Sequence, residues 1–354
     1  MASLEANSIL SPDSVPYRIP QPNNMGIVRY VLAFAVVVAH YNVLAGGNIW
    51  FPVTSGQAVG GFFALSGYLM AGSFLKRPDW KFFIKGRCRR LLPAYWATVL
   101  LFALICGLIS SDSGCFASGQ FWKYLAANMA FLNFIEPSIP GVFIDNPIHA
   151  VNGSLWTMKV EWMLYLTTPV ALYFFVKFKK RVIWMIAGVY LFSALYKFGF
   201  LYLYEISGKE IYNILSRQFL GMLMYYYSGI LIYYFFSKFM RYKWWVFGIS
   251  LLTAIIFSNF GFYQLYVAPF IVSVLVLWFS MVGKWGTFEG KRDNISYNVY
   301  LVHFPVIQLA YQYGLPDRLG NAGAFILVVA ATFLISWIIC VGVEKPVQKY
   351  WKIK

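Results

Sequence analysis

Residues 27–45 read IVRYVLAFAVVVAHYNVLA, a mostly apolar run interrupted by Arg29 and His40. At a helical rise of about 1.5 Å per residue, a run of this length crosses a hydrocarbon layer about 30 Å thick. Similar runs recur along the chain and predict about ten transmembrane helices. They lie near 27–45, 57–75, 92–110, 160–177, 182–201, 218–237, 244–260, 264–282, 296–313 and 323–343.

The composition of the whole chain agrees with this interpretation. The 354 residues are 12% charged and 60% hydrophobic, whereas a soluble chain carries about 25% charged and 45–50% apolar residues. We therefore expect an all-α polytopic membrane helix bundle. Residues 1–24 differ because they are polar, rich in proline and without the apolar core of a signal peptide. They predict a cytoplasmic tail before a transmembrane domain at 25–354.

The basic residues predict the orientation. With both termini in the cytoplasm, 23 of the 29 Lys and Arg residues lie on the cytoplasmic side and 6 on the other, as the positive-inside rule requires. The net charge of +16 then reflects orientation and contact with anionic membrane lipids, and it does not indicate a nucleic acid partner. Cys115 alone among the cysteines is expected on the outer side of the membrane, where an impermeant thiol reagent should reach it, whereas Cys88 is expected in the cytoplasm. The cysteines and histidines lack ligand spacing, so no metal is expected.

Arg29 and His40 carry the strongest chemical signal. Eleven residues apart on a helix, they share one face and are separated by about 16 Å along the axis. An ionisable side chain deep in a membrane span is costly and usually functional. As structural alternatives, Arg29 could extend to the membrane surface and His40 could be a neutral histidine packed in the bundle. The position of both residues on one helix face favours a functional role.

A basic segment precedes the third span. Residues 74–96 read FLKRPDWKFFIKGRCRRLLPAYW, with more positive charge than orientation requires. We expect Arg87, Arg89 and Arg90 to cluster at the start of a helix, where backbone N–H groups and the helix dipole attract anions. Arginine forks suit phosphate oxygens. The segment therefore predicts a cytoplasmic site for a phosphorylated cofactor, with lipid headgroup binding as the alternative.

Other polar residues lie within predicted spans. Ser66 follows glycines that permit close helix packing in GGFFALSGYLM at 60–70. Glu161 needs a partner, and a structural pair with Lys159 or Arg217 is the simple alternative to a functional role. His303 lies midway along the ninth span with no evident structural need.

One long outer segment, 111–159, contains no full span. Within it, QFWKYLAANMAFLNF at 120–134 predicts an amphipathic helix that lies on the outer surface or dips into it. Asn152, Gly153 and Ser154 read as turn and cap residues that open the fourth span.

These segments together resemble the membrane-bound acyltransferase-3 family, the integral O-acyltransferases that modify bacterial surface glycans. The resemblance runs from about Met25 to Trp351. It rests on the spacing of Arg29 and His40, on FFALSGYL at 62–69, RCRRLLPAYW at 87–96, SLWTMKVEWMLY at 154–165 and SYNVYLVHFP at 296–305. Many relatives carry a fused extracytoplasmic hydrolase-like domain, which this chain, ending at Lys354, is expected to lack.

The resemblance implies transfer of an acetyl group from cytoplasmic acetyl-CoA, the co-substrate, to a hydroxyl of an extracytoplasmic or lipid-linked glycan at the inner membrane. It implies that His40 is the base or an acyl relay, and that Glu161 orients His40 or binds the sugar. The implied donor-binding residues are Arg29, Arg87, Arg90, Ser66 and Tyr95, and the implied acceptor-binding residues are Ser154, Trp156 and His303. The alternative is a polysaccharide or lipid transporter or flippase without acyl transfer. Such a protein would show inverted repeats and broken helices, which the sequence does not.

Overall fold

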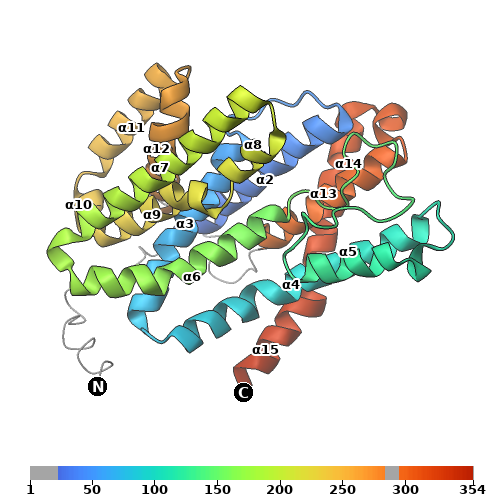
Figure 1. Ribbon diagram of the computed structural model, residues 1–354, viewed down its shortest axis with the longest axis horizontal. Helices are drawn as coiled ribbons and strands as arrows, with labels where there is room; N and C mark the ends of the chain where they lie inside the picture. Colours follow the sequence, from blue (N-terminus) through green and yellow to red (C-terminus); the bar gives the residue numbers. More distant parts are fainter. Residues whose placement is uncertain (1–22, 284–294, 354) are drawn as a thin grey trace. The chain divides into compact units, whose positions relative to one another are not determined.

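The computed structural model describes residues 23–283 and 295–353, and over these ranges it contains helices and no strands. The predicted tail at 1–24 lies outside the described residues except for Asn23 and Asn24, and so do Lys284, Lys291 and Arg292. Each of the ten apolar windows coincides with a helix (Figure 1). These are α2 Met25–Ala45, α3 Ser55–Lys76, α4 Trp80–Ile109, α6 Trp156–Lys177, α7 Val182–Ser207, α9 Phe219–Tyr234, α11 Lys243–Phe257, α12 Ala268–Met281, α13 Ser296–Gln312 and α14 Leu315–Ile339.

Shorter elements complete the helical path. They are the 3-10 turns Cys115–Ala117 and Lys179–Arg181, the helices α5 Gly119–Met129, α8 Glu210–Ser216, α10 Phe236–Arg241 and α15 Lys345–Ile353, and the π-helical turns Tyr263–Val267 and Cys340–Glu344. Gly320 interrupts α14 with a φ of 69°, in the left-handed region that favours glycine. Helix α14 is therefore kinked just before the predicted last span at 323–343, and the helical path continues past 343 into α15.

Six helical stretches of the described residues are long and apolar enough to cross a membrane, which confirms the prediction of a multi-pass membrane protein. They are Met25–Ala45, Ser55–Lys76, Trp80–Ile109, Lys179–Ser207, Tyr263–Met281 and Leu315–Trp351. Of the other predicted spans, α9, α11 and α13 have 16, 15 and 17 residues, and α6 carries Lys159 and Glu161. The total of ten spans and the orientation of the termini stay predictions.

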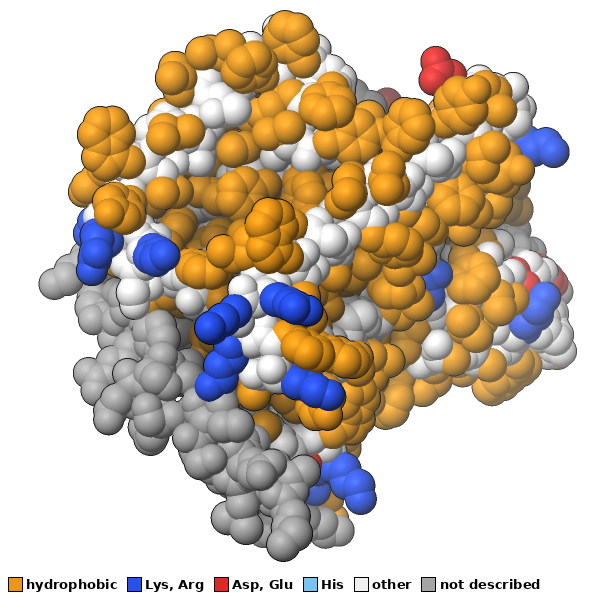
Figure 2. All heavy atoms as spheres, turned by 60° about the vertical axis from the view of Figure 1, so that its left-hand side comes forward, with side chains coloured by type: hydrophobic (Ala, Val, Ile, Leu, Met, Phe, Trp, Pro, Cys, Tyr) orange, Lys and Arg blue, Asp and Glu red, His pale blue; other side chains and the backbone are white. Residues whose placement is uncertain are grey.

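The outward faces of several helices are apolar. Trp184 and Leu195 of α7 and Trp245 and Ile255 of α11 are exposed, and Figure 2 shows a face covered largely by hydrophobic side chains, with Lys and Arg in small groups. Exposure of such an apolar surface to water would be unfavourable, whereas contact with lipid chains is not.

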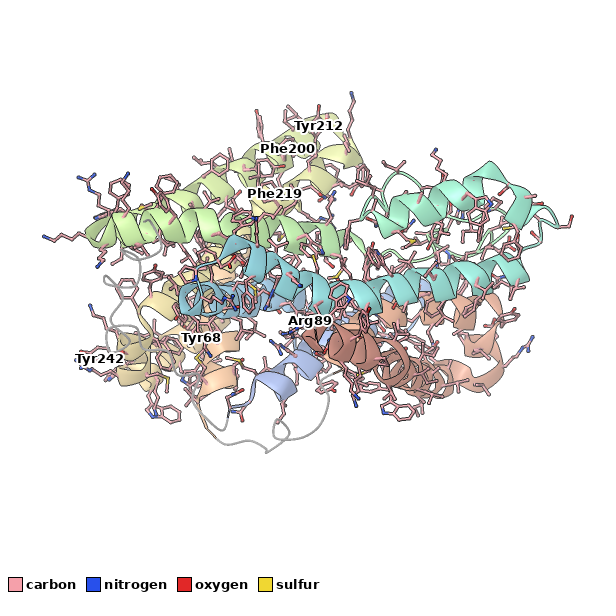
Figure 3. All side chains as sticks on the ribbon, turned by 90° about the horizontal axis from the view of Figure 1, so that it is seen from below. Tyr68, Arg89, Phe200, Tyr212, Phe219 and Tyr242 are labelled. Atoms are coloured by element: carbon pink, nitrogen blue, oxygen red, sulfur yellow. The ribbon has the colours of Figure 1, made fainter. Side chains whose placement is uncertain are left out.

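The described residues form two compact units. The first unit holds 23–29, Gly56–Phe83 and 160–283, and the second unit holds Tyr30–Ser55, Ile84–Lys159 and 295–353. In the first unit, Asn24 ties the start of α2 to the end of α12, since its N–H donates to the Ser280 carbonyl at 2.9 Å. Figure 3 labels Phe200 of α7 and Tyr212 of α8, whose ring centres lie 6.2 Å apart.

In the second unit, hydrogen bonds fix how α2, α13 and α14 run. The Ile295 N–H donates to the Tyr30 hydroxyl at 3.0 Å, so α13 begins beside the start of α2. The Tyr41 hydroxyl donates to the Asn321 carbonyl at 2.8 Å, so the other end of α2 meets the start of α14. Helices α2 and α13 therefore run in the same direction and α14 runs back.

The predicted amphipathic helix exists as α5. The Ser118 hydroxyl caps it by accepting from the Phe121 N–H at 3.1 Å. The end of α5 is attached to α4, because the Tyr95 hydroxyl donates to the Asn128 carbonyl at 2.6 Å. Cys115, expected to be accessible from outside, is only 1% exposed. That expectation was wrong because α5 and the turn before it fold back against α4 and enclose the thiol.

Residues 143–157, here named the return segment, run along α13 in the opposite direction. Four hydrogen bonds mark its course: Phe143 N–H to Gln312 Oε1 at 3.2 Å, Asn146 Nδ2 to the Gln308 carbonyl at 3.0 Å, Gln308 Nε2 to the Ala150 carbonyl at 2.7 Å, and Asn152 Nδ2 to the Leu301 carbonyl at 2.8 Å. The return segment thereby brings Asn152, Gly153 and Ser154 beside the middle of α13.

Candidate active site

Two histidines meet inside the second unit. Nδ1 of His40, on α2, lies 2.8 Å from Nε2 of His303, on α13. Their ring centres are 5.0 Å apart and the planes are 21° from parallel. The two histidines, which the sequence places on two separate spans, are therefore in direct contact. Its partners are 263 residues apart in the chain.

An aromatic ring closes one side of this pair. The centre of the Phe304 ring lies 5.1 Å from that of His40, edge to face. Gly153 of the return segment packs against the same ring, because a Cβ built on Gly153 would lie 2.7 Å from a Phe304 ring carbon. Sequence reasoning missed Phe304 as a site residue, although its position directly after His303 was an available signal. Gly153 was predicted as a turn residue, and its close approach to the ring adds a second reason for glycine.

The two histidines differ in their access to a ligand. His40 is partly exposed, whereas His303 is 0% exposed. Both nitrogens of His303 have partners, since its Nδ1 lies 3.2 Å from the Val299 carbonyl oxygen and its Nε2 faces His40. In this structure the His303 ring is enclosed by its own helix and by His40, and acceptor binding by His303 stays a prediction.

Arg29 and His40 both lie on α2, as predicted, and the helix is unbroken between them. The Arg29 side chain is partly exposed near the start of the helix. The prediction that the two residues share one helix face follows from this continuity.

Arg87 and Arg90 lie well inside α4 and not at its start. The helix begins at Trp80, and Asp79 caps it by accepting from the Phe82 N–H at 3.0 Å. The expected contribution of free N–H groups and of the helix dipole is therefore wrong, since the N–H groups near Arg87 are used within the helix. The signal was present in the sequence, because an aspartate before an apolar run is a typical helix cap. Arg90 is exposed and Arg87 is partly exposed, and Figure 3 labels Arg89 on the same helix.

The arginines of α4 lie close to the start of α13. The Tyr297 hydroxyl donates to the Leu91 carbonyl at 3.2 Å, directly after Arg90. His303 follows six residues later on α13, which corresponds to about 9 Å along the helix. The second unit thus holds the arginines of α4 and the histidine pair on helices that are joined by a hydrogen bond.

Three other predicted residues lie in the second unit. Tyr95 and Ser154 are both 0% exposed. The Tyr95 hydroxyl holds α5, and the Ser154 hydroxyl donates to Asn152 Oδ1 at 2.7 Å. Their polar atoms therefore serve the fold in this structure. Trp156 is partly exposed at the first position of α6.

Ser66 and Glu161 meet in the first unit. The Ser66 hydroxyl donates to Glu161 Oε1 at 3.2 Å, and the Tyr165 hydroxyl donates to the same oxygen. Lys159 and Arg217, the structural partners considered for Glu161, have other contacts. Arg217 Nη2 lies 3.9 Å from Glu210 Oε1, and Lys159 Nζ lies 4.4 Å from the centre of the Phe134 ring. Glu161 is therefore a carboxylate held by two hydroxyl groups.

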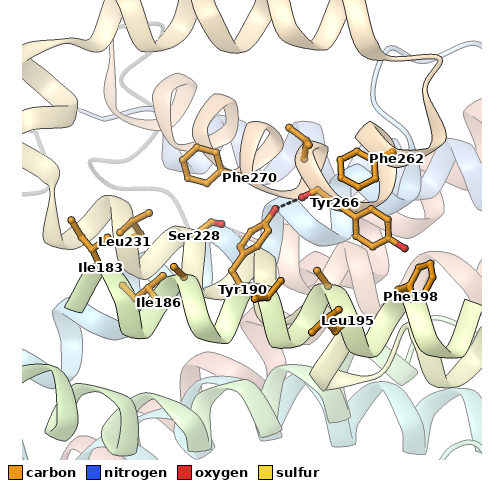
Figure 4. Close-up of a pocket in the computed structure, with 14 residues that line it drawn as sticks. Ile183, Ile186, Tyr190, Leu195, Phe198, Ser228, Leu231, Phe262, Tyr266 and Phe270 are labelled. Carbon is orange, nitrogen blue, oxygen red and sulfur yellow. Dashed lines mark hydrogen bonds between the residues drawn. The ribbon is translucent and has the colours of Figure 1, made fainter. Parts of the chain in front are cut away.

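A separate pocket of about 730 Å³ opens in the first unit between α7, α9 and α12 (Figure 4). Its walls are apolar, with side chains such as Ile183, Leu195 and Phe270. The polar group drawn at its centre, the Tyr190 hydroxyl, donates to the Tyr266 carbonyl at 2.7 Å. This pocket offers apolar contact and no acid or base for catalysis.

Comparison with known proteins gives two matches. Residues 23–341 match the acyltransferase-3 family, described as an acyltransferase domain. The chain is also 30% identical over 154 residues to an O-acetyl transferase of Shigella phage Sf6, a match that covers 42% of this chain and 45% of the relative. The chain thus spans less than half the length of that relative. No solved structure matches this chain.

Proposed function

Because this chain belongs to the acyltransferase-3 family, we propose that it is a transmembrane O-acyltransferase. The proposed reaction moves an acetyl group from cytoplasmic acetyl-CoA to a hydroxyl of an extracytoplasmic or lipid-linked glycan. The proposed location is the inner membrane of a bacterium. The name of the phage relative, an O-acetyl transferase, supports acetyl as the transferred group.

The observation that carries this proposal is the pair of His40 and His303 inside the second unit. His40 is partly exposed and keeps its Nε2 free of the contact with His303, which involves Nδ1. A neutral imidazole with one available nitrogen is a general base or a nucleophile. A histidine that served only packing would not need a second, enclosed imidazole to hold its ring.

The basic residues provide the donor end of the proposed site. Arg87 and Arg90 precede Leu91, to whose carbonyl Tyr297 of α13 is bonded. Arginine forks bind phosphate oxygens, such as those of acetyl-CoA, in two-point geometry. Along α2, about 16 Å separates Arg29 from His40, which suits the extended arm that joins the phosphates of the donor to its thioester. Arg29, near the start of α2, is a further proposed phosphate ligand.

In the proposed step, the acceptor hydroxyl oxygen attacks the thioester carbonyl carbon. The new O–C bond forms and the C–S bond breaks. His40 Nε2 takes the hydroxyl proton and delivers it to the departing thiolate, so that the products are an ester and a thiol. In the relay alternative, Nε2 first attacks the thioester carbonyl carbon, and the C–S bond breaks to leave an acyl-imidazolium and a thiolate. The acceptor hydroxyl oxygen then attacks the acyl carbon, the C–N bond breaks, and the hydroxyl proton goes to the thiolate, so that the products are again an ester and a thiol.

We propose that Glu161 binds the acceptor. Its Oε1 is held by Ser66 and Tyr165, and a carboxylate with a second oxygen is a strong acceptor for sugar hydroxyl groups. Trp156 offers a partly exposed ring for a sugar to pack on. Because Nδ1 of His40 faces His303, we propose acceptor binding for Glu161 rather than the alternative role of orienting His40.

The test is acetyl transfer by purified His40→Ala in nanodiscs, measured together with acetyl-CoA binding. We expect transfer to be lost while donor binding remains, because the thioester end contributes little to ground-state affinity. His149→Ala is the matched control, since His149 is exposed. Turnover of His40→Ala at a rate near that of the wild type would show that His40 is a packing residue and would contradict the proposal.

A further inference from the structure

His303 is held at both ring nitrogens, and the two partners differ in kind. Its Nδ1 lies 3.2 Å from the carbonyl oxygen of Val299, one turn earlier on α13. Its Nε2 lies 2.8 Å from Nδ1 of His40. A carbonyl oxygen only accepts hydrogen bonds, so Nδ1 of His303 must carry a proton.

The proton on Nδ1 of His303 determines the rest of the chain of hydrogen bonds. A neutral imidazole with a proton on Nδ1 has a lone pair on Nε2. His40 must then donate to that lone pair from its own Nδ1–H. The remaining nitrogen of His40, Nε2, is left with its lone pair.

The surroundings favour neutral rings. His303 is 0% exposed, and two positive imidazoles with nitrogens 2.8 Å apart would repel each other strongly in a medium of low dielectric constant. Among the residues that the structure describes, neither histidine forms an ion pair with a carboxylate. A triad of the serine protease kind orients its histidine with an aspartate, and here a second neutral histidine takes that place.

We propose that His303 is a positioning residue, which holds His40 in the tautomer that carries its proton on Nδ1 and so makes Nε2 the reactive atom. The inference rests on the proposed function for the role of His40 in transfer, while the tautomer itself follows from the geometry. When Nε2 takes the proton of the acceptor hydroxyl, the His40 ring becomes positively charged. The hydrogen bond from Nδ1–H to His303 then becomes charge-assisted and about twice as strong. His303 therefore acts on the transition state more than on substrate binding.

The first test reads the tautomer directly in the unliganded full-length protein. The chain has three histidines, so ¹⁵N-histidine labelling in detergent micelles gives three ring spectra in a ¹H–¹⁵N correlation experiment. His149→Gln and His303→Gln assign the signals. We expect His40 and His303 both to show a protonated Nδ1 and an unprotonated Nε2. A wild-type His40 with its proton on Nε2 would overturn the proposal.

The second test compares two replacements of His303. His303→Gln places an amide oxygen near the position of Nε2 and retains an acceptor for His40, whereas His303→Leu has similar bulk and no acceptor. We expect kcat for acetyl transfer to fall between about 10²- and 10⁴-fold in His303→Leu. The Gln variant should retain at least about tenfold more activity than the Leu variant. The KM for acetyl-CoA should change less than about threefold in both.

Equal loss in both variants, or a near wild-type kcat in His303→Leu, would overturn the positioning role. If His303→Leu does not fold, the spectrum of the wild type and the activity of His303→Gln still decide the question. The two proposals fail separately. A protein that shows the expected tautomers but transfers no acetyl group contradicts the proposed function alone, and an active protein with the opposite His40 tautomer contradicts this inference alone.

Discussion

Gly67 of α3 lies so close to Tyr226 of α9 that a Cβ built on the glycine would be 2.0 Å from the Tyr226 carbonyl oxygen. The contact is reciprocal, since a Cβ on Gly229 of α9 would lie 2.0 Å from the Ala64 carbonyl oxygen on α3. The two helices of the first unit therefore meet backbone to backbone. Small residues at a membrane helix interface allow this approach, as the glycines at 60–67 predicted.

Gly67→Ala should separate α3 from α9, because backbone atoms cannot move aside as a flexible side chain can. We expect a loss of about 1–3 kcal/mol in stability, measured as a lower thermal unfolding temperature in detergent. Gly56→Ala, in the same helix, is the control, since nothing lies within 4 Å of its added Cβ. Equal unfolding temperatures for the two variants would disprove the tight contact.

Arg87→Ala and Arg90→Ala should each weaken acetyl-CoA binding about tenfold or more. Charge-assisted hydrogen bonds to phosphate contribute roughly 1.5–3 kcal/mol each. Calorimetry on the purified protein measures this directly. Arg241→Ala is the control, because Arg241 is an exposed arginine of α10 in the first unit. If the double variant binds acetyl-CoA with unchanged affinity, the arginines would instead bind lipid headgroups.

Arg29→Ala should mainly raise the KM for acetyl-CoA. Arg29→Lys should recover only part of the loss, because a single ammonium replaces a two-point fork. Steady-state kinetics with varied donor concentration separates this from a change in kcat. A variant whose kcat falls while its KM is unchanged would assign Arg29 to the chemical step and not to donor binding.

The orientation can be tested with introduced thiols, because Cys115 is enclosed. Ser113, near the start of the outer segment, and Ser237 of α10 are both exposed. In a Cys88→Ser background, an impermeant maleimide should label Ser113→Cys in intact cells. It should label Ser237→Cys only after the cells are permeabilised. The reverse pattern would place Arg87 and Arg90 on the outer side of the membrane, where they could not bind cytoplasmic acetyl-CoA.

The helices could be predicted from the sequence because each apolar window is a local property. All ten windows became helices, and α5 formed where the amphipathic pattern indicated. The start of α4 was misplaced by about three turns because the charged residues after Asp79 read as a loop. Once Asp79 caps the helix, lysine and arginine continue it without penalty, since both have good helix propensity.

The candidate site was harder to predict because its geometry depends on distant parts of the chain. His40 and His303 were each identified from their depth in a span, but no local pattern shows that α2 and α13 run side by side. The return segment was read as a surface loop with a cap at its end. Only the fold reveals that Asn152 is bonded to the middle of α13 and that Gly153 reaches the Phe304 ring.

The return segment is attached to α13 in a way that restricts its length more than its sequence. Gln308, which is 0% exposed, binds the backbone carbonyls of Ile148 and Ala150 at 2.5 and 2.7 Å. Backbone groups are present whatever the side chains, so evolution can replace the exposed residues at 144, 145 and 147 freely. A single insertion or deletion between Asn146 and Asn152 would instead shift a residue with a side chain into the place of Gly153. Among homologous chains, this stretch should therefore vary in composition while its number of residues stays constant.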